Sequence, residues 1–348
     1  MVYHLANEIS KQGEEVWVYA DAGPNQSGSW SDSSQTFKIL RSGGLKPMRR
    51  RAKARSIKLT AQHNNHPVIL ADTWKSLEFL DTTFAARTAC LAHGSEFPRQ
   101  PSRQKHKRIC RALAKADVII ANSAYTASRV ALYTSNKHIA VVHPGIDEPA
   151  QDTILYEQTR SIIGGNKPVL ITIARLEKRK GHQQVIDLLP ALIKDFPDLV
   201  YIIVGEGPCH SGLVSQVKSH ALQDHVQFVG TLMGAEKNAY LNNSDVFVMP
   251  GIEAGDDIEG YGIAYIEAGY FGVPSIASEL GGASDAVDHE KTGLVCVPAD
   301  MSCLERSLRK LISDKDCRNL LGNGARRKAR ESLWPARIKD YTKLFFET

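Results

Sequence analysis

Short apolar runs alternate with amphipathic segments through both halves of the chain. Pro67–Asp72 and Pro168–Ala174 are short and mostly apolar, which is typical of strands buried on both faces of a parallel sheet. Met1–Gln12 instead repeats its apolar residues at helical spacing. This alternation predicts an α/β protein with two doubly wound domains that face each other across a cleft. The other predicted strands are residues 15–20, 37–40, 89–94, 117–123, 139–142, 200–204, 226–232, 245–250, 274–277 and 293–296.

Further helices are predicted between these strands. Ala124–Leu132 follows an Asn-Ser pair that can cap its first turn. The closing segment from Trp334 carries its apolar residues on one side, which indicates a helix that packs on a core. The remaining helical segments before residue 120 are the basic stretch Lys46–Lys58 and Lys105–Lys115.

The segment Glu253–Gly272 is predicted to be a loop that leads into a helix. It opens with acidic residues and glycines, and its helical run ends before Val273-Pro274. A helix N-terminus has unpaired N–H groups and partial positive charge, which suit phosphate or sugar oxygens. Glu259 lies at the start, and Glu267 is expected about two turns inside the helix. This pattern favours a sugar-nucleotide site, although an acidic first turn that only complements the helix dipole would look the same.

Length and composition fit a globular protein of two domains. With 348 residues, each half can bury a core of its own. No apolar run approaches the length of a membrane span, and the N-terminus lacks the basic and apolar regions of a signal peptide. The six cysteines are scattered without a C-x-x-C pair. The sequence therefore predicts a reduced, cytoplasmic compartment without structural zinc or disulfides.

Charge is divided unequally between the two halves. Residues 1–150 carry 21 Lys and Arg against 12 Asp and Glu, whereas the remainder carries 22 against 26. A solvated helix face would explain the basic stretch of residues 46–58, but such clusters also bind anionic membranes. No zinc-finger spacing or RNA-binding signature accompanies them, which argues against nucleic acid. The candidate membrane-contacting residues are Arg49, Arg50, Arg51, Lys53 and Arg55.

A second basic segment follows the strand predicted at Pro168–Ala174. Arg175 and Lys180 lie between the end of this strand and the next helix. Arginine offers a planar fork and lysine a compact charge, so both suit the oxygens of a diphosphate. An ordinary exposed basic loop is the alternative. The chain has no phosphate-binding G-x-x-x-x-G-K loop and no G-x-G-x-x-G motif, which argues against a P-loop NTPase or a dinucleotide oxidoreductase.

His93 and the pair His63 and His66 are the candidate functional histidines. His93 ends a predicted strand, and open α/β sheets bind ligands at the carboxyl ends of their strands. A structural role is the common alternative for a single histidine. His63 and His66 have a spacing seen in metal sites, but they lie in an Asn-containing polar segment without further ligands. No metal is therefore predicted there.

The residues Glu259 to Glu267 reproduce an E-x7-E signature, and this part of the chain resembles the retaining GT-B glycosyltransferases of family four. The similarity continues through Gly272-Val273-Pro274, Gly281-Gly282 and Asp285-Ala286-Val287. It extends over nearly the whole chain and is strongest in the order Arg175, Lys180, Glu259, Glu267. Within the family, the chain is similar to bacterial lipid-linked mannosyltransferases of the phosphatidylinositol mannosyltransferase type.

The resemblance implies roles for individual residues. Arg175 and Lys180 would bind the donor diphosphate, Glu259 would orient the sugar and Glu267 would bind the ribose, while His93 would lie beside the transferred sugar. It also implies metal-independent transfer with retention of configuration and without a cofactor. The other donor-binding residues that it implies are Gly205, Leu232, Gly260, Tyr261, Gly262 and Ile263.

The resemblance also divides the chain. Residues 1–150 would form the acceptor-binding domain, residues 151–330 the donor-binding domain, and residues 331–348 a helix that crosses back to the first domain. Such N-terminal domains normally begin with a strand and a glycine-rich loop, whereas this sequence begins inside the first helix. We therefore expect that strand and loop to lie outside this sequence.

The function implied is transfer of a hexose from GDP-mannose or a UDP-sugar to a lipid-linked or polysaccharide acceptor. Such an enzyme would be cytoplasmic or peripheral on the inner face of the plasma membrane. Two alternatives remain open at this point. One is a sugar-nucleotide-binding protein without transfer activity, and the other is a GT-B enzyme with a soluble acceptor, such as an epimerase or a disaccharide synthase.

Overall fold

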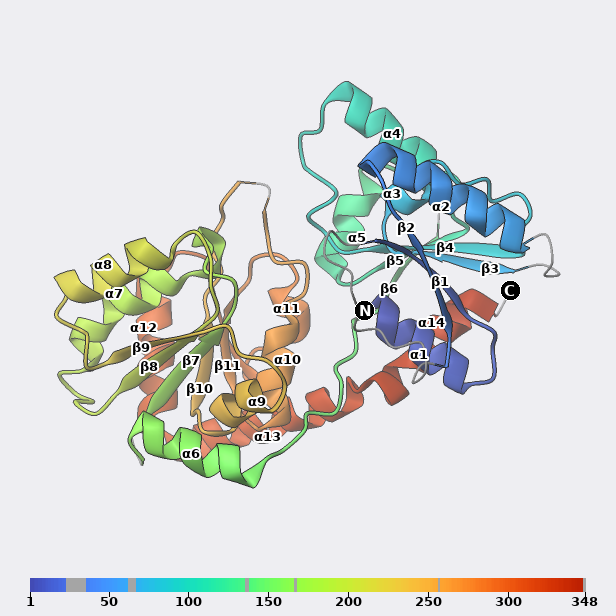
Figure 1. Ribbon diagram of the computed structural model, residues 1–348. Coiled ribbons are helices and arrows are strands. Elements are labelled where there is room, and N and C mark those ends of the chain that lie inside the picture. The colour runs from blue at the N-terminus through green and yellow to red at the C-terminus, as the bar shows by residue number, and fades with distance from the viewer. Residues whose placement is uncertain (23–35, 62–66, 135–137, 166–167, 256, 347–348) are drawn as a thin grey trace. The chain divides into compact units, whose positions relative to one another are not determined.

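A computed structural model describes the chain except for residues 23–35, 62–66, 135–137, 166–167, 256 and 347–348. It divides into two compact units, which are coloured by residue number in Figure 1. The N-terminal unit comprises Met1–Gly145 together with Trp334–Thr348, and the C-terminal unit comprises Ile146–Leu333. Each unit contains a parallel sheet flanked by helices, as the alternation of apolar and amphipathic segments predicts.

The C-terminal unit is built on a parallel sheet with strand order β12-β11-β10-β7-β8-β9 in its described residues. The central strands β7 and β8 are almost entirely buried, which explains their continuous apolar sequence. The strands are β7 (Val169–Ile173), β8 (Val200–Val204), β9 (Val226–Gly230), β10 (Val246–Met249), β11 (Ser275–Ser278) and β12 (Gly293–Cys296).

Helices cover this sheet and enclose two apolar clusters. One cluster contains Val185, Leu189 and Leu308, and the other contains Phe247, Tyr265 and Ala329. The helices of this unit are α6 (Thr153–Ile163), α7 (His182–Leu192), α8 (His210–Ser219), α9 (Gly234–Asn242), α10 (Ile263–Tyr270), α11 (Ala283–Ala286), α12 (Met301–Ser313) and α13 (Lys315–Glu331).

The N-terminal unit has two parallel sheets. One has the order β3-β4-β5-β6, and the other pairs β1 with β2. No strand among the described residues joins them. The strands are β1 (Trp17–Asp21), β2 (Lys38–Ser42), β3 (Val68–Ala71), β4 (Arg87–Ala92), β5 (Val118–Ala121) and β6 (His138–Val141). The helices are α1 (Val2–Lys11), α2 (Lys46–Ala61), α3 (Trp74–Leu77), α4 (Arg103–Leu113), α5 (Ala124–Ala131) and α14 (Trp334–Phe346).

The C-terminal helix α14 belongs to the N-terminal unit. It contacts α1 and β4, and Figure 1 shows it beside α1. The Trp334 ring stacks on His4 with centroids 5.4 Å apart, and the Tyr341 hydroxyl donates to the carbonyl of Val142 over 3.3 Å. Ile338 and Phe345 are buried in the same cluster. The predicted return of the closing helix to the first domain is thus confirmed.

Among the described helices, none combines the length and apolar character that a membrane span requires.

Candidate functional site

The acidic loop between β10 and α10 carries Glu259 close to the start of that helix. Gly262 immediately precedes α10 with a φ of +85°, a conformation that L side chains rarely adopt. A Cβ atom on Gly262 would lie 2.5 Å from the Tyr265 ring, so the turn requires glycine on two counts. The helix begins at Ile263. Glu267 therefore lies little more than one turn inside α10, and the expectation of two turns was wrong.

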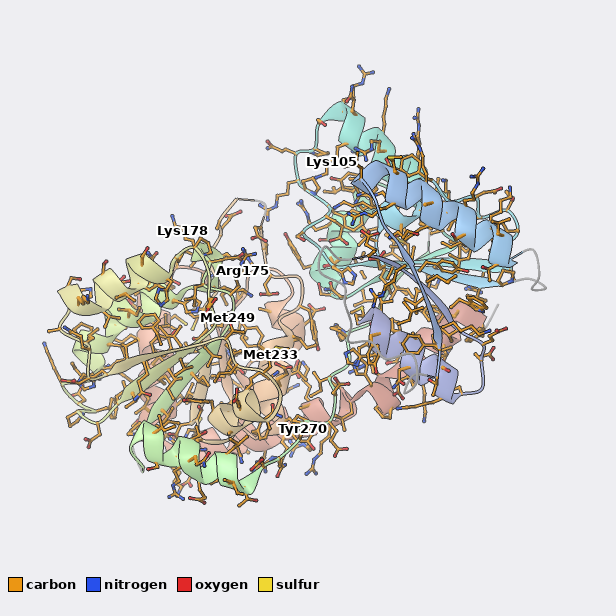
Figure 2. The ribbon with its side chains drawn as sticks, viewed as in Figure 1. Lys105, Arg175, Lys178, Met233, Met249 and Tyr270 are labelled. Carbon is orange, nitrogen blue, oxygen red and sulfur yellow. The ribbon has the colours of Figure 1, made fainter. Side chains whose placement is uncertain are left out.

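The basic turn after β7 lies beside this loop. A short 3-10 helix, η2 (Lys178–Lys180), leads through Gly181 into α7, and Figure 2 labels Arg175 and Lys178 on this turn. Gly181 has a φ of +79°, and a Cβ atom there would lie 2.2 Å from the carbonyl oxygen of Pro250. This close approach of two backbones brings the basic turn against the loop that carries Glu259.

Glu259 is held by two cations of the basic turn. Its Oε2 atom accepts hydrogen bonds from Lys180 and from Nη1 of Arg179, the latter over 3.2 Å. All three side chains are less than one quarter exposed. Burial alone would raise the pKa of Glu259, but Lys180 and Arg179 outweigh that effect and hold the pKa below its ordinary value. The carboxylate is therefore ionised and fixed in place.

Arg179 is a site residue that the sequence analysis missed. Besides Glu259, its Nε atom lies 3.0 Å from carboxylate oxygens of both Glu177 and Asp257. These three carboxylates outweigh the effect of burial and raise the pKa of Arg179. The run of one acidic and three basic residues in Glu177–Lys180 was visible in the sequence. Asp257 and Glu259, which lie 78 and 80 positions after Arg179, could not be recognised from the sequence as its partners.

Arg175 has a different environment from its neighbours. Its side chain is 69% exposed, and its Nη1 atom lies 3.2 Å from Oε1 of Glu177. It lies just beyond the carboxyl end of β7, the edge at which α/β sheets bind their ligands. The guanidinium is therefore accessible to a ligand at this edge.

Glu267 pairs with a residue that was not anticipated. The ammonium group of Lys237, on α9, lies 2.7 Å from Oε1 of Glu267, and both side chains are about four-fifths buried. The lysine follows Leu232, the expected base-binding residue, by five positions along the chain. Leu232 packs against the apolar cluster that includes Ile266. Glu267 and Leu232 therefore lie in the same part of this unit.

Gly205 lies where β8 ends. It has a φ of +132°, and a Cβ atom there would lie 2.1 Å from the carbonyl oxygen of Ala174. Its N–H donates to the carbonyl of Gly230 over 2.7 Å. Gly205 therefore lies at the end of β8, close to the backbone that follows β7 and hydrogen-bonded to the last residue of β9.

Lys180 and Glu259 also line a small hollow with a volume of about 10 Å³. Its lining includes Ser278, which is 2% exposed at the end of β11, and the Ser278 hydroxyl has no hydrogen-bond partner among the described residues. Burial, together with the charge of Glu259, raises the pKa of Tyr265 well above its ordinary value, so the phenol stays neutral. The other lining residues are Arg179, Met249, Gly251, Ile252, Leu280 and Ala283.

His93 belongs to the N-terminal unit and not to this cluster. It follows β4. The ring Nε2 atom donates to the carbonyl of Asp72 over 3.0 Å, and the backbone N–H of His93 donates to Oε1 of Glu96 over 2.8 Å. These contacts fix the ring at the carboxyl end of the strand. His63 and His66 lie outside the described residues. Within the described part of the chain, no three His, Cys, Asp or Glu side chains are grouped to hold a metal ion.

The basic residues predicted to meet a membrane lie on α2, and several have partners within their own unit. Arg51 lies over the Phe79 ring at 5.1 Å, and Arg55 is exposed. The ion pairs are Arg49 with Asp21 at 3.6 Å, Lys53 with Asp21 at 2.7 Å, and Arg50 with Glu78 at 3.2 Å.

Comparison with known proteins assigns both units. The family model described as "Glycosyl transferases group 1" matches residues 157–328, and that described as "Glycosyltransferase Family 4" matches residues 1–148. The GDP-mannose-dependent alpha-(1-6)-phosphatidylinositol monomannoside mannosyltransferase of Mycobacterium tuberculosis is 32% identical over 219 residues, covering 60% of this chain and 56% of that protein. The protein of the same name from Mycolicibacterium smegmatis is 35% identical over 205 residues, covering 57% and 54%. The chain thus spans about half the length of these curated relatives.

Solved structures with a similar fold extend over the whole chain. Anabaena HepE in complex with UDP and glucose matches with a TM-score of 0.79 and 18% identity, covering 99% of this chain and 95% of that one. Sucrose-phosphate synthase from Thermosynechococcus elongatus matches with a TM-score of 0.77 and 20% identity, covering 99% and 91%. The two family models show that the chain belongs to the group 1 and family 4 glycosyltransferases, and the similar solved structures show that it has the GT-B fold.

Proposed function

We propose that this protein transfers a hexose from a nucleoside diphosphate sugar to a hydroxyl group of a glycan or lipid-linked acceptor. The observation that carries the proposal is the ion-paired cluster of Lys180, Arg179 and Glu259 at the entrance to α10, with Glu267 on the same helix. Donor binding is assigned to the C-terminal unit. The basic N-terminal unit, with His93 at a strand end, is assigned to the acceptor.

The cluster supports the chemistry of a departing nucleoside diphosphate. Arg175 is exposed beside the basic turn, and its fork can take phosphate oxygens in two parallel hydrogen bonds. Lys180 and the first N–H groups of α10, beginning at Ile263, supply further positive charge that is already in place before the reaction. These groups would stabilise the charge that develops on the leaving phosphate. We therefore propose that the reaction needs no metal ion.

The carboxylates suit the sugar portions of the donor. An ionised carboxylate accepts hydrogen bonds from hydroxyl groups. Glu259 is ionised and lies at the mouth of α10, so it is placed to orient the hydroxyls of the transferred sugar. Glu267 would accept from the ribose diol, in exchange for or in addition to its bond with Lys237. Gly260, Tyr261 and Gly262 complete the backbone of this mouth.

The donor and acceptor are proposed from the relatives. Two mannosyltransferases whose names describe them as GDP-mannose-dependent are 32% and 35% identical to this chain over the matched residues. Their names also specify a phosphatidylinositol monomannoside, which favours a lipid-linked acceptor. A UDP-sugar is the second candidate donor, because HepE binds UDP and glucose. Retention of the anomeric configuration is proposed because the chain resembles retaining enzymes.

The exposed face of α2 supports contact with a membrane surface. Leu45, which immediately precedes α2, and Met48 and Leu59 on the helix are 73%, 63% and 54% exposed, and the exposed cations Arg51 and Arg55 lie between Met48 and Leu59 along the chain. Exposed apolar side chains can enter the lipid boundary while neighbouring cations meet anionic headgroups. We propose this face as the contact with the inner leaflet.

Donor binding is tested with a thermal-shift panel of GDP-, UDP- and ADP-sugars, with and without Mg²⁺. A ligand present at 100 times its dissociation constant should stabilise the protein by about 2.7 kcal/mol. We expect a metal-independent shift for one nucleotide, and its loss in Arg175→Ala and Glu267→Ala. Lys178→Ala, which removes an exposed cation from the same turn, should retain it. No shift with any nucleotide would refute the proposed donor site.

Membrane contact is tested separately by sedimentation with vesicles containing anionic phospholipid. Binding should weaken as salt rises, because exposed charges are screened over about 10 Å at 0.1 M salt. Met48→Ser together with Leu59→Ser should weaken it at every salt concentration. The outcome against the proposal is binding that neither salt nor these substitutions change.

A further inference from the structure

Arg179 connects three carboxylates and the backbone of the acidic loop. Its Nε atom lies 3.0 Å from both Glu177 and Asp257, and its Nη1 atom lies 3.2 Å from Glu259. Its carbonyl oxygen accepts the N–H of Ile252 over 2.9 Å. One residue therefore holds the loop near its beginning through the main chain and near its end through the guanidinium.

From this arrangement we infer that Arg179 is a positioning residue, which fixes the acidic loop so that the Glu259 carboxylate is presented to the donor sugar. The inference rests on the proposed function for the role of Glu259. It concerns a residue between the two expected diphosphate ligands, Arg175 and Lys180, with a task different from theirs.

Electrostatics explains why the loop needs an arginine here. Glu177, Asp257 and Glu259 bring three negative charges around one side chain, and like charges at such separations repel each other. A guanidinium can meet several carboxylates at once, because its N–H groups point in different directions within one plane. Without it, Lys180 alone would face Glu259, and Asp257 would have no described cation.

The same geometry argues against direct phosphate binding by Arg179. Its Nε and Nη1 atoms already engage three carboxylates, whereas the Lys180 ammonium group contacts only Glu259 among the ion pairs of the described residues. Arg175 is 69% exposed and contacts only Glu177 among the ion pairs of the described residues. A diphosphate can therefore recruit Arg175 by replacing one exposed contact, whereas recruiting Arg179 would release the loop.

Calorimetric binding distinguishes these roles when each variant is titrated with a nucleoside diphosphate and with the matching nucleotide sugar. The probes are GDP with GDP-mannose and UDP with UDP-glucose. In Arg179→Gln we expect the affinity for the nucleotide sugar to fall about tenfold or more, as for a lost charge-assisted hydrogen bond. Affinity for the diphosphate alone should change less than about threefold. Arg179→Lys, which retains one charge, should recover part of the loss.

Lys178→Gln is the matched control. Lys178 precedes Arg179 by one position and its side chain is exposed, so this substitution removes a neighbouring positive charge. We expect it to bind both probes as the wild type does. Equal loss of both probes in Arg179→Gln would make Arg179 a phosphate ligand and overturn the inference. Loss of neither would overturn it as well.

Hydrogen exchange tests the inference independently of any ligand. The Gly282 N–H donates to the carbonyl of Glu259 over 2.9 Å, so its exchange reports the position of Glu259. It should exchange faster in Arg179→Gln than in the wild type or Lys178→Gln. Unchanged exchange would overturn the positioning role even if donor binding is found. Faster exchange in a protein that binds none of the probes would support the positioning role and refute the proposed function.

Discussion

Gly281→Ala should displace Glu259 without changing any side chain that contacts the donor. Gly281 has a φ of +71°, and a Cβ atom there would lie 2.3 Å from the carbonyl oxygen of Glu259 and 2.5 Å from Cγ2 of Ile258. Ordinary contact begins at 3.4 Å. The Cβ atom and the carbonyl oxygen of Glu259 must therefore separate by about 1.1 Å, the difference between 3.4 and 2.3 Å.

A displacement of this size affects catalysis more than folding. Misplacing a reacting group by about 1 Å can lower a rate about 100-fold, which corresponds to about 2.7 kcal/mol. The left-handed backbone adds a stability cost of about 1–2 kcal/mol for alanine. We therefore expect nucleoside diphosphate release from the preferred donor to slow about 100-fold, with a fall in melting temperature of a few degrees.

Gly255→Ala is the control for the backbone conformation. Gly255 lies in the same acidic loop with a φ of +68°, but a Cβ atom there would meet nothing within 4 Å. It should lose similar stability and less than about threefold in rate, because the strain is the same and the clash is absent. Equal rate losses in Gly255→Ala and Gly281→Ala would refute the reasoning, as would full activity of Gly281→Ala.

Three predictions concern stability and use unfolding in urea. Burial lowers the folded-state pKa of His182 from 6.5 to about 4, so the unfolded chain binds the proton more readily and stability falls as the pH drops through this interval. That loss should reach about 3 kcal/mol and be absent in His182→Leu; parallel pH curves would contradict it. Ile338→Ala, on the buried side of α14, should destabilise the N-terminal unit by about 2–5 kcal/mol, while exposed Lys339→Ala changes little; equal effects would mean that α14 is not docked. Gly205→Ala should destabilise the C-terminal unit, because its Cβ atom would lie 2.1 Å from a backbone oxygen. Gly212→Ala, in open space on α8, should be neutral or stabilising. A larger loss of stability in Gly212→Ala than in Gly205→Ala would count against the strand-end geometry.

The secondary structure was largely predictable because local sequence determines it. The strands of the C-terminal unit are short apolar runs, and those at Val169–Ile173 and Val246–Met249 agree with the predicted segments to within about one residue at each end. Their apolar character follows from burial on both faces of the sheet. The single apolar side of α14 predicted a helix packed on a core, whereas its return to the N-terminal unit was implied by the resemblance to GT-B glycosyltransferases.

The candidate site was predictable only in part. The spacing from Glu259 to Glu267 and the order of Arg175 and Lys180 are local patterns, and the structure brings Glu259 and Lys180 into contact. Arg179 gave no such signal. A charged residue in a loop is usually solvated, and its partner Glu259 is 80 positions away.

Sequence alone therefore determined the α/β alternation, the two-domain organisation and the resemblance of the motif residues to a glycosyltransferase site. Only the tertiary structure decided which charges meet. It turned Arg179 toward three carboxylates, left Arg175 exposed, paired Glu267 with Lys237 and placed several cations of α2 against acidic partners. Periodicity records whether a residue faces a core or solvent, because burial acts on every residue of an element. Ion pairs depend on where separate loops approach each other, and close backbone contacts such as that of Gly181 with Pro250 set those approaches.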